Sequence, residues 1–321
     1  MIKDPVKETF ENASFSINDL KKFIHALPPE DGTQWGENLL RFFQGHDLNI
    51  TPSGFYSNTP VFNELDEHYE QNENQPIYFD KSVFNERLIK DFFALIKPFS
   101  IEFSPPNQAV SEDNQYYSNN MFFSHSDAMS YYAVLRYLKP KQVIEIGSGF
   151  STLVAKEALD RNNNSGKILA IEPFPRDFLF DVEKVEVKQT IAQKIDPAWL
   201  DSKLDNGDVL FIDSTHTVKQ GSDVIHIICS ILPKLTKNIF VHFHDIFLPF
   251  SMPKEWVYGG RYWEEQYLLY AFLLENEHAT VRYGSTVNHL LLGDEMSKFT
   301  VSDSVGGGSI WIELNGKKII K

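Results

Sequence analysis

The sequence is short of cysteine, of clustered positive charge and of long apolar runs, and each shortage excludes a class of protein. Cys229 is the only cysteine, so a disulfide framework is excluded and a reducing compartment fits. Lys and Arg total 30 against 44 Asp and Glu, a net charge of −14, which argues against nucleic acid as a partner. The longest apolar stretches, such as residues 224–232, are too short and interrupted to span a bilayer.

The N-terminal segment lacks a signal for export. Residues 1–25 mix Lys, Asp and Glu with isolated apolar positions, so they contain no secretory apolar core. We therefore expect a soluble cytoplasmic protein without a membrane span, and the sequence leaves open whether it is a homo-oligomer.

The chain is long enough for one large domain and an extra segment. It has 321 residues, of which 42% are hydrophobic and 23% charged, as in a globular protein with a well-formed core. Residues 1–110 combine many aromatics with polar, Pro-rich pieces. Helical periodicity is visible near residues 17–27, 37–43 and 84–96, and residues 51–78 suggest an irregular loop. We expect residues 1–110 to form a cap that covers an active site or packs on outer helices, with the main domain at residues 111–321.

The most informative stretch is residues 141–152, Lys-Gln-Val-Ile-Glu-Ile-Gly-Ser-Gly-Phe-Ser-Thr. A short apolar run with Glu145 precedes a Gly-x-Gly turn, and a helical pattern follows. Glycine lets the backbone approach a ligand closely, and the helix N-terminus offers free N–H groups, so the stretch predicts a nucleotide-type cofactor. A dinucleotide site would have Gly-x-Gly-x-x-Gly, but Thr152 stands where the third glycine belongs.

After this turn the chain alternates strands and helices, which predicts a doubly wound, mostly parallel α/β sheet of seven strands with helices on both faces. The expected strands are 143–146, 167–171, 185–188, 209–212, 239–243, 280–283 and 309–314. The expected helices are 127–137, 151–161, 222–232 and 264–275.

Ligands of such sheets bind at the carboxyl ends of the strands, where several polar residues are found here. Glu172 follows the second strand and can accept both hydroxyls of a ribose, in either an NAD or a SAM site. Asp213 follows the fourth strand, with His216 three residues on, and His244 and Asp245 follow the fifth. We expect Asp213, His244 and Asp245 to converge and to suit a divalent cation such as Mg²⁺, Mn²⁺ or Fe²⁺.

Neighbouring residues leave several alternatives open. His242 lies within the fifth strand and is expected to be a buried, hydrogen-bonded core histidine. The segment 116–128 is placed to close over a cofactor, although Asp127 is also a good helix N-cap. The aromatic loop after the fifth strand is a natural substrate wall, with surface packing as the competing explanation. Its candidate substrate contacts are Trp256, Arg261, Trp263 and Glu265.

Three strings together resemble the class I SAM-dependent methyltransferases, over roughly residues 115–290. They are Ile-Glu-Ile-Gly-Ser-Gly-Phe-Ser-Thr, Phe-Ile-Asp-Ser-Thr-His and Val-His-Phe-His-Asp-Ile-Phe. The likeness is greatest to a bacterial branch often found beside glycosyltransferases, and more distant to catechol- and macrocin-type O-methyltransferases. Those metal-dependent enzymes place an Asp after the fourth strand, as Asp213 is placed here. They carry an acidic or amide pair after the fifth, where His244 replaces the usual acid.

The resemblance implies a Rossmann-like fold, SAM as cofactor and methyl transfer to a small polar acceptor. A sugar or glycoconjugate hydroxyl is the class suggested by family analogy. The implied SAM-binding residues are Glu145, Gly147, Ser148, Gly149, Ser151, Thr152, Glu172 and Asp213. The implied catalytic residues are Asp213, His216 and His244, with either histidine as general base or a cation that lowers the pKa of the acceptor hydroxyl.

Other function classes share part of this pattern. An NAD-dependent oxidoreductase would use the same glycine turn and Glu172, but it would need the missing third glycine. A non-catalytic SAM-binding protein would not need the polar residues at the strand ends. A related metal-site protein on the same fold, such as the cephalosporin hydroxylase family, is a third alternative.

Overall fold

The computed structural model describes residues 16, 18–19, 22, 41, 43–49, 57–68, 75–109, 115–163, 166–300 and 307–316. The chain divides into two compact units, Met1–Glu67 and His68–Lys321. Helix α4 (Phe62–His68) lies at the end of the first unit, with its last residue assigned to the second, and it corrects the expected irregular loop at residues 51–78. The helices expected near residues 17–27 and 37–43 fall mostly outside the described residues. No helix in the described ranges has the length and apolar character to cross a membrane.

The second unit is built on a seven-stranded sheet in the order β3-β2-β1-β4-β5-β7-β6. Strands β1 to β5 pair in parallel, and β7 runs antiparallel to its neighbours β5 and β6. The predicted fold class, a mostly parallel doubly wound α/β sheet, is confirmed. The strands are β1 (Gln142–Ile146), β2 (Lys167–Ile171), β3 (Val185–Lys188), β4 (Val209–Ile212), β5 (Ile239–Phe243), β6 (Ala279–Gly284) and β7 (Ile310–Leu314).

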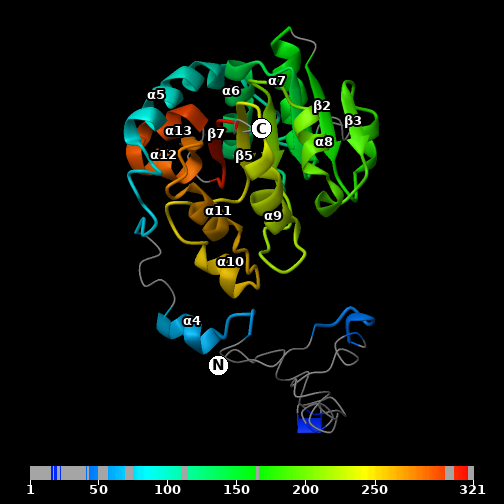
Figure 1. Ribbon diagram of the computed structural model, residues 1–321. Coiled ribbons are helices and arrows are strands. Elements are labelled where there is room, and N and C mark those ends of the chain that lie inside the picture. The colour runs from blue at the N-terminus through cyan, green and yellow to red at the C-terminus, as the bar shows by residue number, and fades with distance from the viewer. Residues whose placement is uncertain are drawn as a thin grey trace, which may run out of the picture. The chain divides into compact units, whose positions relative to one another are not determined.

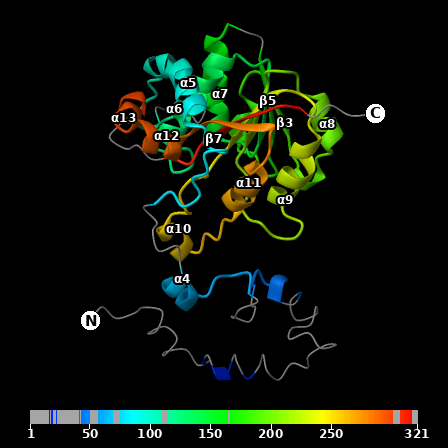
Figure 2. The same ribbon diagram turned by 60° about the vertical axis from the view of Figure 1, so that its left-hand side comes forward.

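Helices lie on both faces of this sheet (Figures 1 and 2). They are α5 (Glu86–Ile96), α6 (His125–Leu138), α7 (Phe150–Arg161), α8 (Pro197–Ser202), α9 (Asp223–His226), α10 (Lys254–Tyr258), α11 (Glu265–Leu273), α12 (Ser285–Leu292) and α13 (Asp294–Thr300). Short turns of 3-10 helix are η1 (Lys97–Glu102), η2 (Asp177–Phe180), η3 (Ala192–Lys194) and η5 (Leu232–Lys234), and η4 (Ile227–Ile231) is a π-helical turn.

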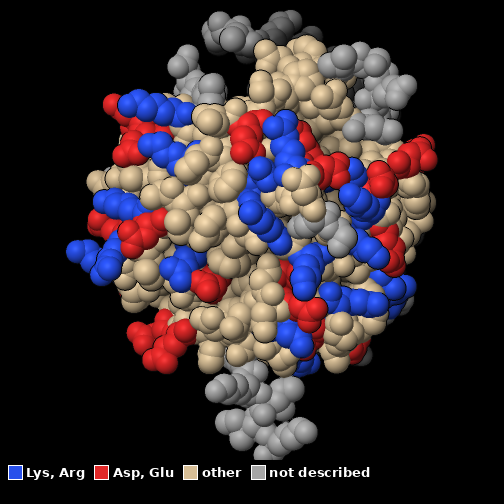
Figure 3. Space-filling view, turned by 90° about the horizontal axis from the view of Figure 1, so that it is seen from above, with Lys and Arg blue, Asp and Glu red and all other residues tan. Residues whose placement is uncertain are grey.

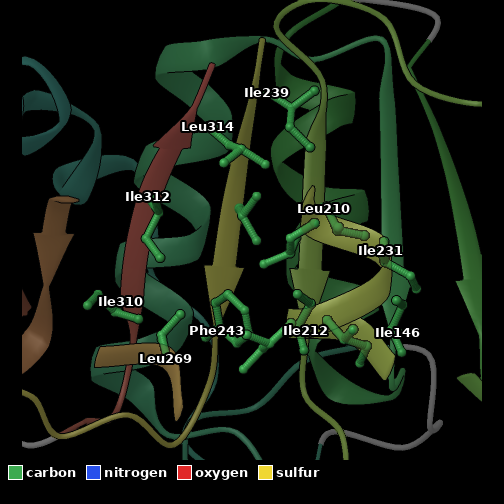
Figure 4. Close-up of a cluster of buried hydrophobic side chains, with 14 of the residues drawn as sticks. Ile146, Leu210, Ile212, Ile231, Ile239, Phe243, Leu269, Ile310, Ile312 and Leu314 are labelled. Carbon is green, nitrogen blue, oxygen red and sulfur yellow. The ribbon is translucent and has the colours of Figure 1, made fainter. Parts of the chain in front are cut away.

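Alternate residues of the central strands enter two separate hydrophobic cores. Ile144 of β1 packs in the core on one face. The same core contains Ile231 of η4 and Leu269 of α11 (Figure 4). Val143, the neighbour of Ile144, packs in the core on the other face with α6 and α7. Because both faces are covered, the strands are apolar almost throughout, as expected for parallel sheets.

The end of the expected cap segment belongs to the core of the second unit. Helix α5 is capped by Asn85, whose side chain accepts a hydrogen bond from the Leu88 N–H. The helix buries Phe92 and Phe93 against the core that contains α6. Phe103 lies in the same core. In this stretch the described side chains pack into the core, and the cap role expected for residues 1–110 stays a prediction.

The surface of the second unit mixes both signs of charge. In the view of Figure 3, Lys and Arg side chains alternate with Asp and Glu over much of the face. The strand ends that carry the predicted site residues lie together at one edge of the sheet, where α10 and α11 follow β5 along the chain.

Candidate active site

A cavity of about 610 Å³ lies at the carboxyl ends of β1, β2, β4 and β5. One end is formed by the glycine turn and Glu172, and the other by a cluster of imidazoles and carboxylates. The predicted site residues that line it are Gly147, Ser148, Gly149, Ser151, Glu172, Asp213, His216, His244, Asp245, Trp256, Arg261 and Trp263.

The two glycines of the turn serve different purposes. Gly147 has φ +86°, and a Cβ on it would come within 1.7 Å of the carbonyl oxygen of Asp213, so only glycine fits between β1 and β4. Gly149 has extended backbone, and a Cβ there would meet nothing within 4 Å. The space beside Gly149 is open to the cavity and remains free for a ligand.

Two predicted cofactor contacts lie behind the cavity wall. Glu145 and Thr152 are fully buried and do not line the cavity. Glu145 accepts hydrogen bonds from the hydroxyls of Tyr131 and Thr152, and the Thr152 hydroxyl also accepts from the Gly149 N–H. Burial raises the pKa of Glu145 to about 7. The acidic residue of the motif therefore supports the turn from beneath.

Around the glycine turn the cavity offers groups that suit an adenosine-type ligand. Glu172 accepts hydrogen bonds from the N–H groups of Ser148 and Phe174, and the buried Ser148 hydroxyl has no partner in the described structure. Arg176, which was not singled out from the sequence, stacks on Phe122 at 4.4 Å from the ring centre.

The other end of the cavity brings together two imidazoles and two aspartates. Nε2 of His216 lies 3.3 Å from Oδ1 of Asp213 and 3.6 Å from Oδ2 of Asp245. Nδ1 of His244 lies 3.4 Å and 3.6 Å from the same two oxygens. The convergence of Asp213, His244 and Asp245 matches the geometry expected from the strand ends, and His216 joins them.

Each imidazole has a further carboxylate on its far side. Nδ1 of His216 lies 2.8 Å from Oε2 of Glu265, and Nε2 of His244 lies 3.4 Å from Oδ2 of Asp127. Glu265 was expected to contact the substrate, but it is buried behind His216 and does not line the cavity.

Asp127 was recognised from the sequence only as part of a closing segment or as a helix cap. The N-cap of α6 is Ser124 instead. Asp127 is buried and accepts hydrogen bonds from Ser309 Oγ at 2.7 Å and from the Gly308 N–H at 3.0 Å. The run of glycines at 306–308 was the available signal, since a Cβ on Gly307 would lie 2.7 Å from Oδ1 of Asp127.

The ionisation of this cluster is set by its opposing charges. Burial disfavours the charged forms of His216 and His244, but the neighbouring carboxylates outweigh it. They raise the pKa of His216 to about 10 and that of His244 well above its usual value. Burial likewise opposes ionisation of Asp213, yet the two histidines hold its pKa far below the ordinary range. With only these groups present, both imidazoles are cationic at neutral pH.

Two residues of the cluster are held in an unusual backbone conformation. His216 has φ +59° and Asp245 has φ +55°, a left-handed region that side chains other than glycine rarely adopt. Such conformations persist where the surroundings enforce them, and they are concentrated at functional sites. Here they turn both side chains toward Asp213.

An aromatic wall borders the cluster. Trp263 stacks near His216 with ring centres 4.5 Å apart, and it meets Trp256 edge-on at 5.3 Å. The guanidinium of Arg261 lies 4.6 Å from the Trp256 ring centre. All three line the cavity beside the acidic cluster, as the sequence predicted for the loop after the fifth strand.

His242 does not belong to the cluster of imidazoles and carboxylates. It is fully buried, stacks on Phe211 with ring centres 4.6 Å apart, and its Nε2 lies 2.9 Å from Ser309 Oγ. Burial lowers its pKa to about 3, so it is neutral. The expectation of a structural, hydrogen-bonded histidine is confirmed.

Residues 144–246 match a family model described as a methyltransferase domain. The resemblance to the class I methyltransferases is confirmed. A protein of Archaeoglobus fulgidus described as uncharacterized is 42% identical over 65 residues, which are 20% of this chain and 29% of that protein. The match therefore spans less than a third of that relative's length.

Two solved structures are similar over most of their length. The SAH-bound methyltransferase PaMTH1 of Podospora anserina is 17% identical with a TM-score of 0.38, over 73% of this chain and 94% of that chain. The O-methyltransferase of Bacillus cereus in complex with SAH is 11% identical with a TM-score of 0.38, over 73% and 98%.

Proposed function

We propose that this protein is a SAM-dependent O-methyltransferase that acts on a small polar acceptor, with a sugar or glycoconjugate hydroxyl as the favoured class. The single observation that carries the proposal is one continuous cavity with two chemically different ends. A glycine turn and Glu172 form one end, and Asp213, His216, His244 and Asp245 form the other. A methyltransferase needs this combination because it must hold a nucleoside cofactor beside a group that activates the acceptor.

In this proposal the cofactor lies against the glycine turn. The ribose hydroxyls donate hydrogen bonds to Glu172, and the open space beside Gly149 accommodates the amino-acid part of SAM. The unpartnered hydroxyl of Ser148 is available for the same part. SAM held by these residues would supply the methyl group for transfer at the end of the cavity that Asp213 lines.

The acceptor lies between the aromatic wall and the acidic cluster. Trp256 and Trp263 offer flat apolar faces on which a sugar ring can pack, and Arg261 offers donors at the same wall. The acceptor oxygen attacks the methyl carbon in line. The new C–O bond forms as the C–S bond breaks, the sulfur leaves as the neutral thioether, and the hydroxyl proton passes to a base or to water.

In this proposal the cluster of Asp213, His216, His244 and Asp245 assists deprotonation of the acceptor hydroxyl. A divalent cation held there would lower the pKa of the acceptor hydroxyl and orient it. The residues fit such an ion, since Asp213, His216 and Asp245 each offer one donor atom and these atoms lie within 4.8 Å of one another. The alternative is a general base, typically worth roughly 10²–10⁴-fold in rate. His216 and His244 are the candidates, and either imidazole must first lose the proton that the surrounding carboxylates stabilise.

Separate titrations with SAM and with NAD, followed by thermal unfolding, test the proposal. We expect SAM to raise the melting temperature and NAD to leave it unchanged. Stabilisation by NAD alone would instead support the oxidoreductase alternative. If SAM binds but labelled methyl groups reach no acceptor across a broad panel of hydroxyl compounds, the non-catalytic alternative gains.

A further inference from the structure

Six arginines lie in the second unit, and they fall into two groups by their partners. Four of them form an ion pair with a carboxylate, namely Arg87, Arg136, Arg161 and Arg282. Arg176 and Arg261 form no ion pair with any described residue, although the chain has 44 Asp and Glu against 30 Lys and Arg. Both of these unpaired arginines line the cavity. In the second unit, the guanidinium groups without a carboxylate partner are therefore found where a ligand would bind.

The two unpaired arginines belong to different walls of the cavity. Arg176 lies over Phe122 at the cofactor end, 4.4 Å from the ring centre. The guanidinium of Arg261 lies 4.6 Å from the ring centre of Trp256 and 5.6 Å from that of Trp263. These two tryptophans form the aromatic wall beside the acidic cluster. The free guanidinium on the acceptor side is therefore that of Arg261.

The backbone fixes the position of Arg261 on both sides. Its N–H donates a hydrogen bond to the carbonyl of Trp256 at 2.8 Å, which ties it to helix α10. The turn before it uses Gly260 at φ +86°, a conformation that glycine adopts without strain. Farther along the loop, the Glu265 N–H donates to the carbonyl of His216 at 3.2 Å. Arg261 is thus held in a loop that is attached to the reaction end of the cavity.

The side chain of Arg261 is arranged to bind an oxyanion. A guanidinium carries its N–H donors in one plane, so contact of its face with an aromatic ring leaves the donors at its edge free. The side chain is exposed and forms no hydrogen bond with any described residue. The fork of donors matches the two oxygens of a carboxylate or a phosphate, which it binds through two parallel hydrogen bonds. An oxyanion is therefore a better partner for it than a neutral hydroxyl.

The carboxylates of the cavity do not supply this partner. Asp213 and Asp245 line the same cavity, but their oxygens face the imidazoles of His216 and His244 at 3.3–3.6 Å. Neither aspartate pairs with Arg261. In the proposed function, the carboxylate of SAM lies with its amino-acid part against the glycine turn. The oxyanion for Arg261 must then come from the acceptor.

We infer that the acceptor carries a carboxylate or a phosphate group, as a uronic acid or a sugar phosphate does, and that Arg261 binds this group. The ring of the acceptor packs on the aromatic wall, and its hydroxyl faces the acidic cluster. Arg261 is then the residue that selects acidic over neutral hydroxyl compounds. The inference names a substrate class for the proposed acceptor site, and it rests on the proposed function for the reaction itself.

The test measures the binding of matched sugars to the full chain in excess SAH by calorimetric titration. The pairs are D-glucose with D-glucuronate, D-galactose with D-galacturonate, and D-glucose with D-glucose 6-phosphate, and inorganic phosphate probes the anion alone. We expect the charged member of at least one pair to bind at least tenfold more tightly than the neutral member, and more tightly than inorganic phosphate. The uronates and the sugar phosphate together show which oxyanion is preferred. A preference below tenfold in every pair, or inorganic phosphate that binds as tightly as every charged sugar, would overturn the inference.

Three variants assign the preference to one side chain. Arg261→Met keeps an apolar contact with the wall and removes the donors, so it should reduce the preference for the charged sugar to less than twofold. Arg261→Lys keeps the charge without the paired donors and should keep only part of the preference. Arg87→Met, a change of an exposed arginine on α5, is the matched control and should bind like the wild type. A full preference in either Arg261 variant would contradict the role of its guanidinium, and the lysine variant and the wild type decide if Arg261→Met fails to fold.

Titration of the same proteins with SAM separates this inference from the proposed function. We expect Arg261→Met to bind SAM like the wild type. A tenfold loss of SAM affinity in this variant would show that Arg261 binds the carboxylate of the cofactor, and it would overturn the inference while leaving the methyltransferase. Wild-type protein that prefers charged sugars but does not bind SAM would leave the site for acidic sugars standing and remove the methyltransferase.

Discussion

Oε2 of Glu265 lies 2.8 Å from Nδ1 of His216, and both side chains are almost fully buried at the end of the cavity. Because Glu265 does not line the cavity, its influence on a bound ligand must pass through the imidazole. This pair joins the start of α11 to the strand end after β4, and it fixes which nitrogen of His216 faces Asp213.

Changing Glu265 to Gln therefore tests the orientation of the His216 imidazole separately from the binding of the cofactor. We expect kcat/KM for methyl transfer to fall roughly 10–100-fold, as for other outer carboxylates of metal-binding histidines, while the Kd for SAM stays within about twofold. Calorimetric titration with SAM and initial rates measure the two quantities. A large loss of SAM affinity would show that Glu265 contacts the cofactor after all.

Asp213 is the residue shared by both imidazoles, so its removal should affect chemistry most. We expect Asp213→Ala to abolish turnover and to retain measurable SAM affinity, since the Asp213 backbone that supports Gly147 remains. Asp181→Ala, at an exposed position, is the control. Full activity of Asp213→Ala would contradict the assignment of the reaction centre.

The two glycines of the turn offer a matched pair. Gly147→Ala places a methyl group against the carbonyl of Asp213 at a positive φ, and we expect destabilisation of about 3 kcal/mol or more. Gly149→Ala meets no protein atom within 4 Å, so it should fold like the wild type and bind SAM at least tenfold more weakly. Thermal unfolding and SAM titration of both variants check this, and equal SAM affinity in Gly149→Ala would remove the cofactor from that position.

We expect the buried carboxyl of Glu145 to make the stability of the folded protein depend on pH. Its pKa is raised by burial to about 7 in the folded protein from 4.5, so the folded state retains a proton that the unfolded chain loses. This raised pKa contributes about 3 kcal/mol to the free energy of unfolding. The contribution is fully present below pH 4.5 and declines as pH rises toward 7. Denaturant unfolding of the wild type and Glu145→Gln measures it. The difference in unfolding free energy between them should change over this window, and a constant difference would contradict the buried acid.

We expect the aromatic wall to affect the binding of the acceptor and not the binding of SAM. Arg261 stacks on Trp256 and, within the described residues, has no carboxylate partner. We expect Arg261→Met to raise the KM for the acceptor at least fivefold and to leave the Kd for SAM unchanged. A variant with unaltered acceptor KM would place acceptor binding elsewhere.

The seven strands and the residues at their carboxyl ends were predictable because each is a local pattern. A short apolar run marks a strand, and the polar residue that follows marks the ligand edge, as at Glu172 and Asp213. Helices α8, α10, α12 and α13 were missed, because they are short and lack a clear apolar period. The expected helix at 222–232 is α9 followed by the π-helical turn η4.

The outer carboxylates were the part of the site that sequence reasoning could not assign. Asp127 reaches Ser309, 182 residues away along the chain, and Glu265 reaches His216 from 49 residues away. Both lie on helices where an acidic residue near the N-terminus has an ordinary explanation as a favourable charge. Only the packing of α6 and α11 beside the strand ends distinguishes them from such residues.

The central claim is most directly tested by incubating the protein with SAM that carries a deuterated methyl group and with a panel of sugar and phenolic hydroxyl compounds. We expect one acceptor to gain the mass of a deuterated methyl group while SAM is converted to SAH, and Asp213→Ala to give neither product. Failure of the protein to bind SAM, together with binding of NAD, would contradict the account.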